Sequence, residues 1–268
     1  MPADLEGDRR ALDLAAIQTG LRASRYGCKL RILDRVTSTN DEARRMAAEA
    51  PAGSVILADE QTAGRGQHGR AWSSPAGTSL YLSILDRPNL DGRSLPMLTL
   101  AVGLAVSDVA DEVLSRSGVT ARSRIKWPND VRVAGRKIAG ILVESTSEGG
   151  RVGPVVIGIG LNVKERPWPE ELIDKAASLE DFTVRPLERM AVLAQLLDAV
   201  ETRVDRLAAG AHAELIADLE ERLEWRQQRV RCGEIEGVLI GLAPSGALRI
   251  ATTDGERQVI SGSPEPLD

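Results

Sequence analysis

Residues that build metal sites, disulfide frameworks and His-based catalytic arrangements are scarce in this sequence. Its 268 residues include two cysteines, Cys28 and Cys232, and two histidines, His68 and His212. The cysteines lie far apart and match no metal-ligand spacing, so we expect both to be unpaired in a reducing compartment. Two histidines exclude a His-rich metal site and leave little material for a Ser-His-Asp arrangement.

Long apolar runs are missing as well. Met1–Arg10 is acidic and polar, without the apolar stretch of a signal peptide, and no run approaches the roughly 20 residues that a membrane helix needs. The net charge of −5 argues against non-specific binding of nucleic acid by the whole surface. We therefore expect a cytoplasmic protein with no membrane partner. Its 43% of hydrophobic residues is enough for a large core.

Hydrophobic periodicity predicts a mixed α+β arrangement over residues 1–226. Strands are expected at 29–36, 54–60, 79–86, 124–127, 137–144 and 154–163. Helices are expected at about 10–24, 38–50, 94–115, 187–207 and 211–224. The helix at 38–50 begins with Ser38, Thr39 and Asn40 and has acids in its first turn, which predicts a capped helix start.

The character of the chain changes after Arg226. Short strands are expected at 230–232, 234–242, 247–252 and 258–261, separated by the turn signals Pro244–Gly246 and Asp254–Gly255. Short strands at such regular spacing predict a small β-barrel of SH3-like type. The predicted organisation is therefore one α+β domain over 1–226 and a small all-β domain over 227–268.

The segment Thr62–Arg70 has the composition of an anion-binding loop. It holds three glycines and two arginines in nine residues. Glycine lets backbone N–H groups approach an anion closely, and arginine offers a rigid fork of donors to phosphate or carboxylate. It is not a Walker A loop, since no Lys-Ser or Lys-Thr closes it. A solvated hairpin loop or an RGG-like nucleic-acid contact has the same composition, so the segment alone leaves these alternatives open.

Two further segments contain residues that a plain structural role explains poorly. Lys137 stands at the entrance to an apolar strand, and Gly140 leaves room for a ligand against the backbone, although a solvated strand end remains possible. Gly158 and Gly160 alternate inside a buried strand, which costs stability unless some group approaches the backbone there. This segment is not a dinucleotide-binding fingerprint, because it lacks the third glycine and no helix start follows it.

Taken together, five ordered motifs resemble the biotin–protein ligase family. They are Ser38–Asn40, Glu60–Gly66, Lys126–Asp130, Arg136–Leu142 and Gly158–Asn162, within a match that runs from about 31 to 162. The resemblance implies a mixed-sheet catalytic domain of the biotin/lipoate ligase type, followed by a small SH3-like barrel. It also implies a two-step reaction. Biotin and ATP give biotinoyl-AMP and pyrophosphate, with Mg²⁺, and a lysine of a biotin carboxyl carrier domain then displaces AMP.

The family's functional residues can be carried over motif by motif. The resemblance assigns catalysis to Lys137 and Arg65. It assigns biotin binding to Ser38, Thr39, Asn40, Gln61, Gly64, Arg65, Gly66, Gln67, Lys137 and Gly140. It assigns ATP and adenylate binding to Arg65, Arg70, Trp72, Lys126, Asn129, Lys137 and Asn162, with Asp130 as a candidate for positioning Mg²⁺. Apolar walls are expected from Trp72, Ile141 and Leu142. Gln67 stands where many family members carry an arginine that helps to retain the adenylate.

Two alternatives to a biotin–protein ligase are a ligase for another substrate, lipoate, and a DNA-binding repressor that senses biotin. A lipoate–protein ligase shares the fold and the reaction logic, but the Lys126–Asp130 and Gly64–Gly66 motifs favour biotin. A biotin-sensing repressor carries a winged-helix domain of about 60 residues, whereas about 28 precede Lys29 here, and a basic recognition helix is absent. We therefore expect no DNA among the partners.

Overall fold

Two β-sheets organise the chain. The computed structural model describes residues 21–267 except 24, 28, 91, 149 and 150. The larger sheet has the order β1-β2-β3-β7-β6-β5-β4. Its strands are β1 (Lys29–Val36), β2 (Ser54–Gln61), β3 (Ser79–Asp86), β4 (Ser123–Lys126), β5 (Asp130–Val133), β6 (Arg136–Glu148) and β7 (Arg151–Asn162). β1 and β2 pair in parallel and the other neighbours pair antiparallel, so the expected mixed sheet is confirmed.

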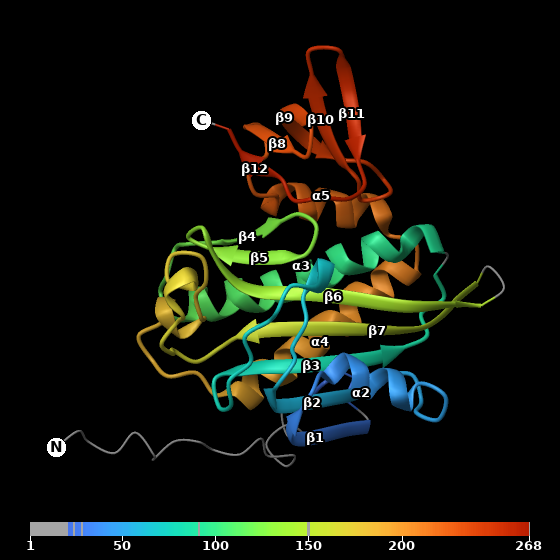
Figure 1. The fold of residues 1–268 in the computed structure, drawn as a ribbon, viewed down its shortest axis with the longest axis vertical. Coiled ribbons are helices and arrows are strands. Elements are labelled where there is room, and N and C mark those ends of the chain that lie inside the picture. Colours follow the sequence, from blue (N-terminus) through green and yellow to red (C-terminus); the bar gives the residue numbers. More distant parts are fainter. Residues whose placement is uncertain (1–20, 24, 28, 91, 149–150, 268) are drawn as a thin grey trace.

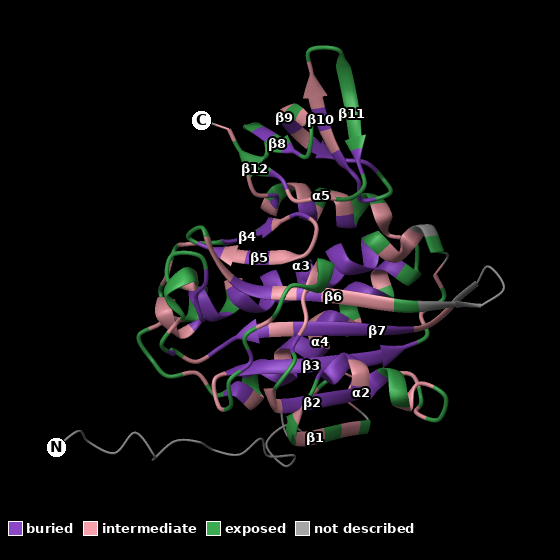
Figure 2. Ribbon diagram, viewed as in Figure 1, coloured by how far each residue is buried: buried purple, intermediate pink, exposed green. Residues whose placement is uncertain are grey.

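Helices cover both faces of this sheet (Figure 1). Helix α2 (Thr39–Met46) connects the parallel strands β1 and β2 and lies on one face. Helices α3 (Leu95–Arg116) and α4 (Arg189–Ala208) lie on the other face, and α5 (His212–Arg222) lies between them and the second sheet. The central strand β3 is buried along its whole length because it has a helical layer on each side (Figure 2). No helix in the described part of the chain is long and apolar enough to cross a membrane.

The second sheet is antiparallel and has the order β11-β10-β9-β8-β12. Its strands are β8 (Arg229–Cys232), β9 (Ile235–Leu242), β10 (Leu248–Thr252), β11 (Gly255–Val259) and β12 (Glu265–Pro266). The turn before β10 joins it to the larger unit, since the Trp127 indole N–H donates to the Gly246 carbonyl at 2.9 Å. Closure of this sheet into an SH3-like barrel stays a prediction.

The expected elements agree with the structure in type and order, with three differences. The β5 and β12 strands were not predicted, and the helix expected at 10–24 falls largely outside the described residues. β5 is four residues long and forms a tight hairpin with β4. Its first residue, Asp130, belongs to the turn signal Pro128–Asp130, so the sequence predicts a turn there and not a strand. The Ser38 N-cap position is correct, but its side chain makes no capping hydrogen bond.

A buried guanidinium joins the three helices on the far face. Arg203 of α4 donates to Asp108 of α3 through Nε at 2.8 Å and Nη2 at 3.1 Å, and to Asp218 of α5 through Nη1. Its side chain is 10% exposed, whereas its two acidic partners are about a third exposed. These contacts join α5 to α3 and α4, together with Arg222 of α5, which also donates to Asp108 at 2.7 Å. Helix α5 in turn contacts the second sheet, since Glu220 accepts from the Leu242 N–H at 2.8 Å.

We predict that Arg203→Met lowers the free energy of unfolding by about 2 kcal/mol, because the change leaves two neighbouring carboxylates without their shared cation. Urea unfolding followed by circular dichroism measures this loss. Arg249→Met is the matched control, since Arg249 makes the same forked contact with Glu256 on an exposed surface. Equal midpoints for the two variants would contradict the role given to Arg203.

Candidate active site

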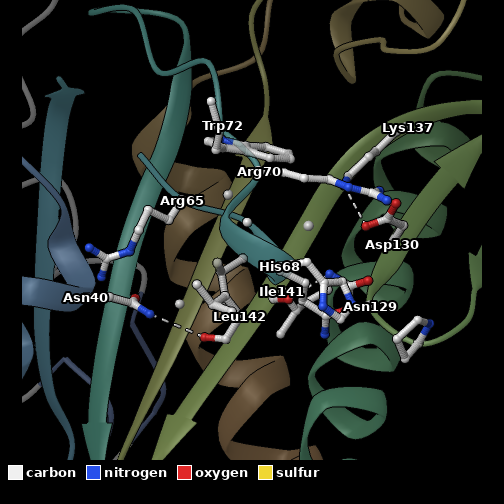
Figure 3. A pocket seen from close by; sticks show the side chains of 18 of the residues that line it. Asn40, Arg65, His68, Arg70, Trp72, Asn129, Asp130, Lys137, Ile141 and Leu142 are labelled. Atoms are coloured by element: carbon white, nitrogen blue, oxygen red, sulfur yellow. Dashed lines mark hydrogen bonds and ion pairs between the residues drawn. The ribbon is translucent and has the colours of Figure 1, made fainter. Parts of the chain in front are cut away.

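A pocket of about 240 Å³ lies on the face of the large sheet that carries α2 (Figure 3). It is bounded by α2, by the glycine-rich loop after β2 and by the β4–β5–β6 hairpins. The predicted site residues that line it are Ser38, Thr39, Asn40, Gln61, Arg65, Gly66, Gln67, Arg70, Trp72, Asn129, Asp130, Lys137, Gly140, Ile141 and Leu142. The structure thus brings together residues that are as far apart in the chain as Ser38 and Leu142.

Three glycines form the floor of the pocket. Gly140 of β6 pairs directly with Gly160 of β7, and Gly158 lies two residues earlier on the same face. A Cβ at Gly158 would lie 2.3 Å from the Asn40 side-chain oxygen, and one at Gly160 would lie 2.5 Å from the Trp72 ring. The sequence-based expectation that some group approaches this backbone is therefore confirmed, and the groups are Asn40 and Trp72.

A hydrogen-bonded polar network lies above this floor. The Thr39 N–H and hydroxyl both donate to the Gln61 side-chain oxygen, at 2.9 and 3.1 Å. The Ser83 hydroxyl of β3 lies 2.8 Å from the Thr39 hydroxyl and 2.6 Å from the Asn40 oxygen. Ser83 is not among the predicted site residues, although a serine in the middle of an apolar strand is a usable signal. The network fixes which atoms can donate and which can accept in this part of the pocket.

The Asn40 amide is oriented by a carboxylate that sequence analysis also missed. Its Nδ2 donates to Glu144 Oε2 at 2.6 Å and lies 3.5 Å from the Leu142 carbonyl (Figure 3). Glu144 also accepts from Arg44 Nη1 at 2.9 Å. With its oxygen at Ser83 and its nitrogen at Glu144, the Asn40 side chain has a single orientation. Asn40 and Glu144 are 104 positions apart in the chain, so no local sequence pattern predicts their contact.

Lys137 enters the pocket from the β6 side. Its Nζ lies 2.6 Å from Asp130 Oδ1 and 5.0 Å from the centre of the Trp72 ring. β5 sets this geometry, because its pairing with β6 places Asp130 opposite Gly140, beyond a register shift. Arg70 extends towards the same pair (Figure 3). The Lys137 ammonium therefore lies between the Asp130 carboxylate and the face of the Trp72 ring, and both contacts are electrostatically attractive.

Arg65 lies on the opposite wall and points to α2 (Figure 3). Its Nη1 and Nη2 donate to the two carboxylate oxygens of Asp41, at 2.8 and 2.6 Å. Hydrogen bonding to Arg65 is the largest cause that holds the pKa of Asp41 below its usual value. Asp41 was predicted as an acid of the first helical turn, which it is, but its contact with the loop was not foreseen.

The loop that carries Arg65 is a small hairpin closed by its own backbone. Gly66 N–H donates to the Arg70 carbonyl at 2.7 Å, and Trp72 N–H donates to the Gly64 carbonyl at 2.9 Å. Gly64 itself does not line the pocket. A Cβ there would lie 2.6 Å from the Trp72 carbonyl and 2.7 Å from the Ser74 hydroxyl, so close packing of the loop requires this glycine.

Two other predicted residues lie outside the pocket lining. Asn162 is buried and donates to the Ala177 carbonyl at 3.0 Å. Lys126 lies half-buried with its Nζ 5.3 Å from the centre of the Trp225 ring, and burial lowers its pKa. Their nucleotide roles therefore stay predictions. The pocket lining also includes Gly262 and Ser263 from the loop between β11 and β12, which no sequence signal marks.

Comparison with known proteins gives consistent results. Residues 31–162 match the model of the Biotin/lipoate A/B protein ligase family. The bifunctional ligase/repressor BirA of Bacillus subtilis is 33% identical over 267 residues, which cover 95% of this chain and 79% of that protein. The biotin–[acetyl-CoA-carboxylase] ligase of Paracoccus denitrificans is 34% identical, over 85% of this chain and 96% of that protein.

A solved structure extends the similarity to three dimensions. The biotin protein ligase of Aquifex aeolicus in complex with biotin and ATP superposes with a TM-score of 0.75 at 31% identity. The match covers 89% of this chain and 98% of that one. Sequence, length of match and fold agree, and the chain belongs to the biotin/lipoate A/B protein ligase family.

Proposed function

We propose that this protein activates biotin with ATP and transfers it to a lysine of a biotin carboxyl carrier domain. The observation that carries the proposal is the placement of two cations, Arg65 and Lys137, on opposite walls of a pocket that also holds a fixed polar network above its glycine floor. The relatives named as biotin ligases, and the Aquifex aeolicus enzyme that holds biotin and ATP, support biotin over lipoate.

The polar end of the pocket suits the neutral ureido ring of biotin. A neutral ring can be selected only by donors and acceptors in fixed positions, because no charge attracts it. Thr39, Asn40 and Gln61 meet this need, since each is already oriented by a partner within the protein. Ser38 lies beside them in the lining, and Trp72, Ile141 and Leu142 supply the apolar wall for the ring and its tail.

The first step joins two anions. An oxygen of the biotin carboxylate attacks the α-phosphorus of ATP, and pyrophosphate leaves with the electron pair of the broken P–O bond. Cations that contact both groups stabilise the charge-dense transition state. Lys137 and Arg65 are proposed to hold the carboxylate and α-phosphate, and Arg70 the outer phosphates. Asn129, whose Nδ2 donates to the Ile141 carbonyl at 3.0 Å, is proposed on the nucleotide side.

Asp130 fits a Mg²⁺ ion that arrives with ATP. It is the one carboxylate in the pocket lining, and the described residues contain no group of three or more His, Cys, Asp or Glu side chains that could hold a metal by themselves. Mg²⁺ is commonly bound by one or two carboxylates together with substrate phosphates, whose charge it neutralises. Binding of Asp130 to such an ion would release Lys137 for the substrate anions.

The second step needs no nucleophile from this chain. The neutral amine of the carrier lysine attacks the acyl carbon of biotinoyl-AMP, an amide bond forms, AMP leaves and the ammonium proton is lost. The glycine-rich loop is proposed to shield the mixed anhydride from water. We further propose that residues 1–226 form the catalytic domain, and that 227–268 form an SH3-like barrel whose Gly262 and Ser263 border the pocket. Biotin, ATP and the carrier domain are the proposed partners.

We predict that Lys137→Ala lowers biotin-dependent exchange of pyrophosphate into ATP by at least about 100-fold, because the transition state loses its nearest fixed cation on that wall. Lys175→Ala is the control, since Lys175 is exposed and does not line the pocket. Unchanged exchange by folded Lys137→Ala protein would refute the role of Lys137.

We also predict that Gly160→Ala raises the KM for biotin about tenfold, since the new methyl group displaces the Trp72 ring from the floor. Steady-state transfer of labelled biotin measures this change. Gly103→Ala is the matched control, because a Cβ at Gly103 in α3 would meet no atom within 4 Å. A KM equal to that of the wild type in the Gly160 variant would show that the floor glycine is dispensable.

A further inference from the structure

We propose that Asp41 competes with the biotin carboxylate for Arg65, and thereby sets the affinity of the site for its acid substrate. This inference rests on the proposed function and concerns a residue outside the recognised motifs. In the structure, both terminal nitrogens of Arg65 are bound by the two oxygens of Asp41. A ligand carboxylate that uses the same fork must share it with Asp41 or replace it.

The exposure of the pair allows such an exchange. The Arg65 side chain is 36% exposed and that of Asp41 is 26% exposed, so water screens their attraction. A fully buried pair of this geometry would hold Arg65 against any ligand, because separation would leave two desolvated charges. Arg65 lines the pocket and neither side chain of the pair is buried, so both ligand and solvent can reach the guanidinium.

Asp41 also has a second cation that remains when Arg65 leaves. Arg44, one helical turn along α2, donates through Nη2 to Asp41 Oδ1, and its Nη1 donates to Glu144 Oε1 at 2.9 Å. The Asp41 carboxylate therefore stays neutralised and anchored after an exchange. Only the guanidinium of Arg65 has to move. The side-chain contacts from Asp41 through Arg44 and Glu144 to Asn40 stay in place.

The competing interpretation is that Asp41 orients Arg65 for the substrate and aids binding. The two interpretations predict opposite signs when the Asp41 charge is removed. A competitor lowers the apparent affinity for an anion that needs Arg65, so its removal strengthens binding. An orienting residue does the reverse. Neither competition nor orientation by Asp41 should change the binding of a ligand without a carboxylate. A general disturbance of the pocket would change the binding of both kinds of ligand.

The test is isothermal titration calorimetry with biotin and with biotinol, in which a neutral alcohol replaces the carboxylate. We expect Asp41→Asn to lower the Kd for biotin about fivefold and to leave that for biotinol unchanged. Asp41→Ser should lower the Kd for biotin in the same way, which shows that the effect comes from loss of the carboxylate and not from the new asparagine. Glu42→Gln is the matched control. It removes one negative charge from the same helix, but Glu42 pairs with Arg31 at 2.8 Å and Arg45 at 2.6 Å, not with the loop.

A double variant ties the effect to Arg65. In an Arg65→Ala background the Asp41 change should have no effect on biotin affinity. Weaker biotin binding in Asp41→Asn, an equal change for biotinol, or a gain that persists without Arg65 would overturn the proposal. If wild-type protein binds neither ligand, the proposed function fails. If it binds both and the Asp41 variants do not change the biotin affinity, only the role of Asp41 fails.

Discussion

The pocket depends on a strip of sheet backbone that carries no side chains. Gly140, Gly158 and Gly160 lie together on adjacent strands, and a Cβ at Gly158 or Gly160 would overlap Asn40 or Trp72. The neighbouring positions of these strands are apolar and buried, as a sheet covered on both faces requires. Without the glycines, α2 and the loop would have to lie farther from the sheet. The polar network around Asn40 and the Trp72 ring would then move apart.

The charged groups follow from this arrangement. The glycine-rich loop brings Arg65 and Arg70 to one side of the pocket, and β6 brings Lys137 to the other. Arg65 has the Asp41 carboxylate beside it, and Lys137 has that of Asp130. Adenylation brings a carboxylate and a triphosphate together, so the protein must hold strong cations in reserve without leaving them unpaired. Acid partners meet this requirement. In the proposed mechanism the two acids then differ, because Asp130 would bind Mg²⁺ when ATP arrives, whereas Asp41 would keep its contact with Arg44.

Local sequence signals predicted the elements and the cations, but not the partners of those cations. β1 and β3 have the predicted bounds, and Lys137, Arg65 and Asn40 all line the pocket. Asp41, Ser83 and Glu144 were missed because each has an ordinary local explanation, and their roles come from contacts between distant segments. Lys126 and Asn162 belong to motifs but lie outside the pocket lining, so their nucleotide roles stay predictions. A motif fixes which residues are near one another in the chain, and packing decides which of them face the ligand.

The central claim is that a single pocket makes and uses biotinoyl-AMP. Transfer of labelled biotin to a purified biotin carboxyl carrier domain, with unlabelled lipoate in excess, tests it most directly. We expect label on the carrier that depends on ATP, is accompanied by AMP and is insensitive to lipoate. A carrier that stays unlabelled with ATP present, or label that excess lipoate suppresses, would contradict it.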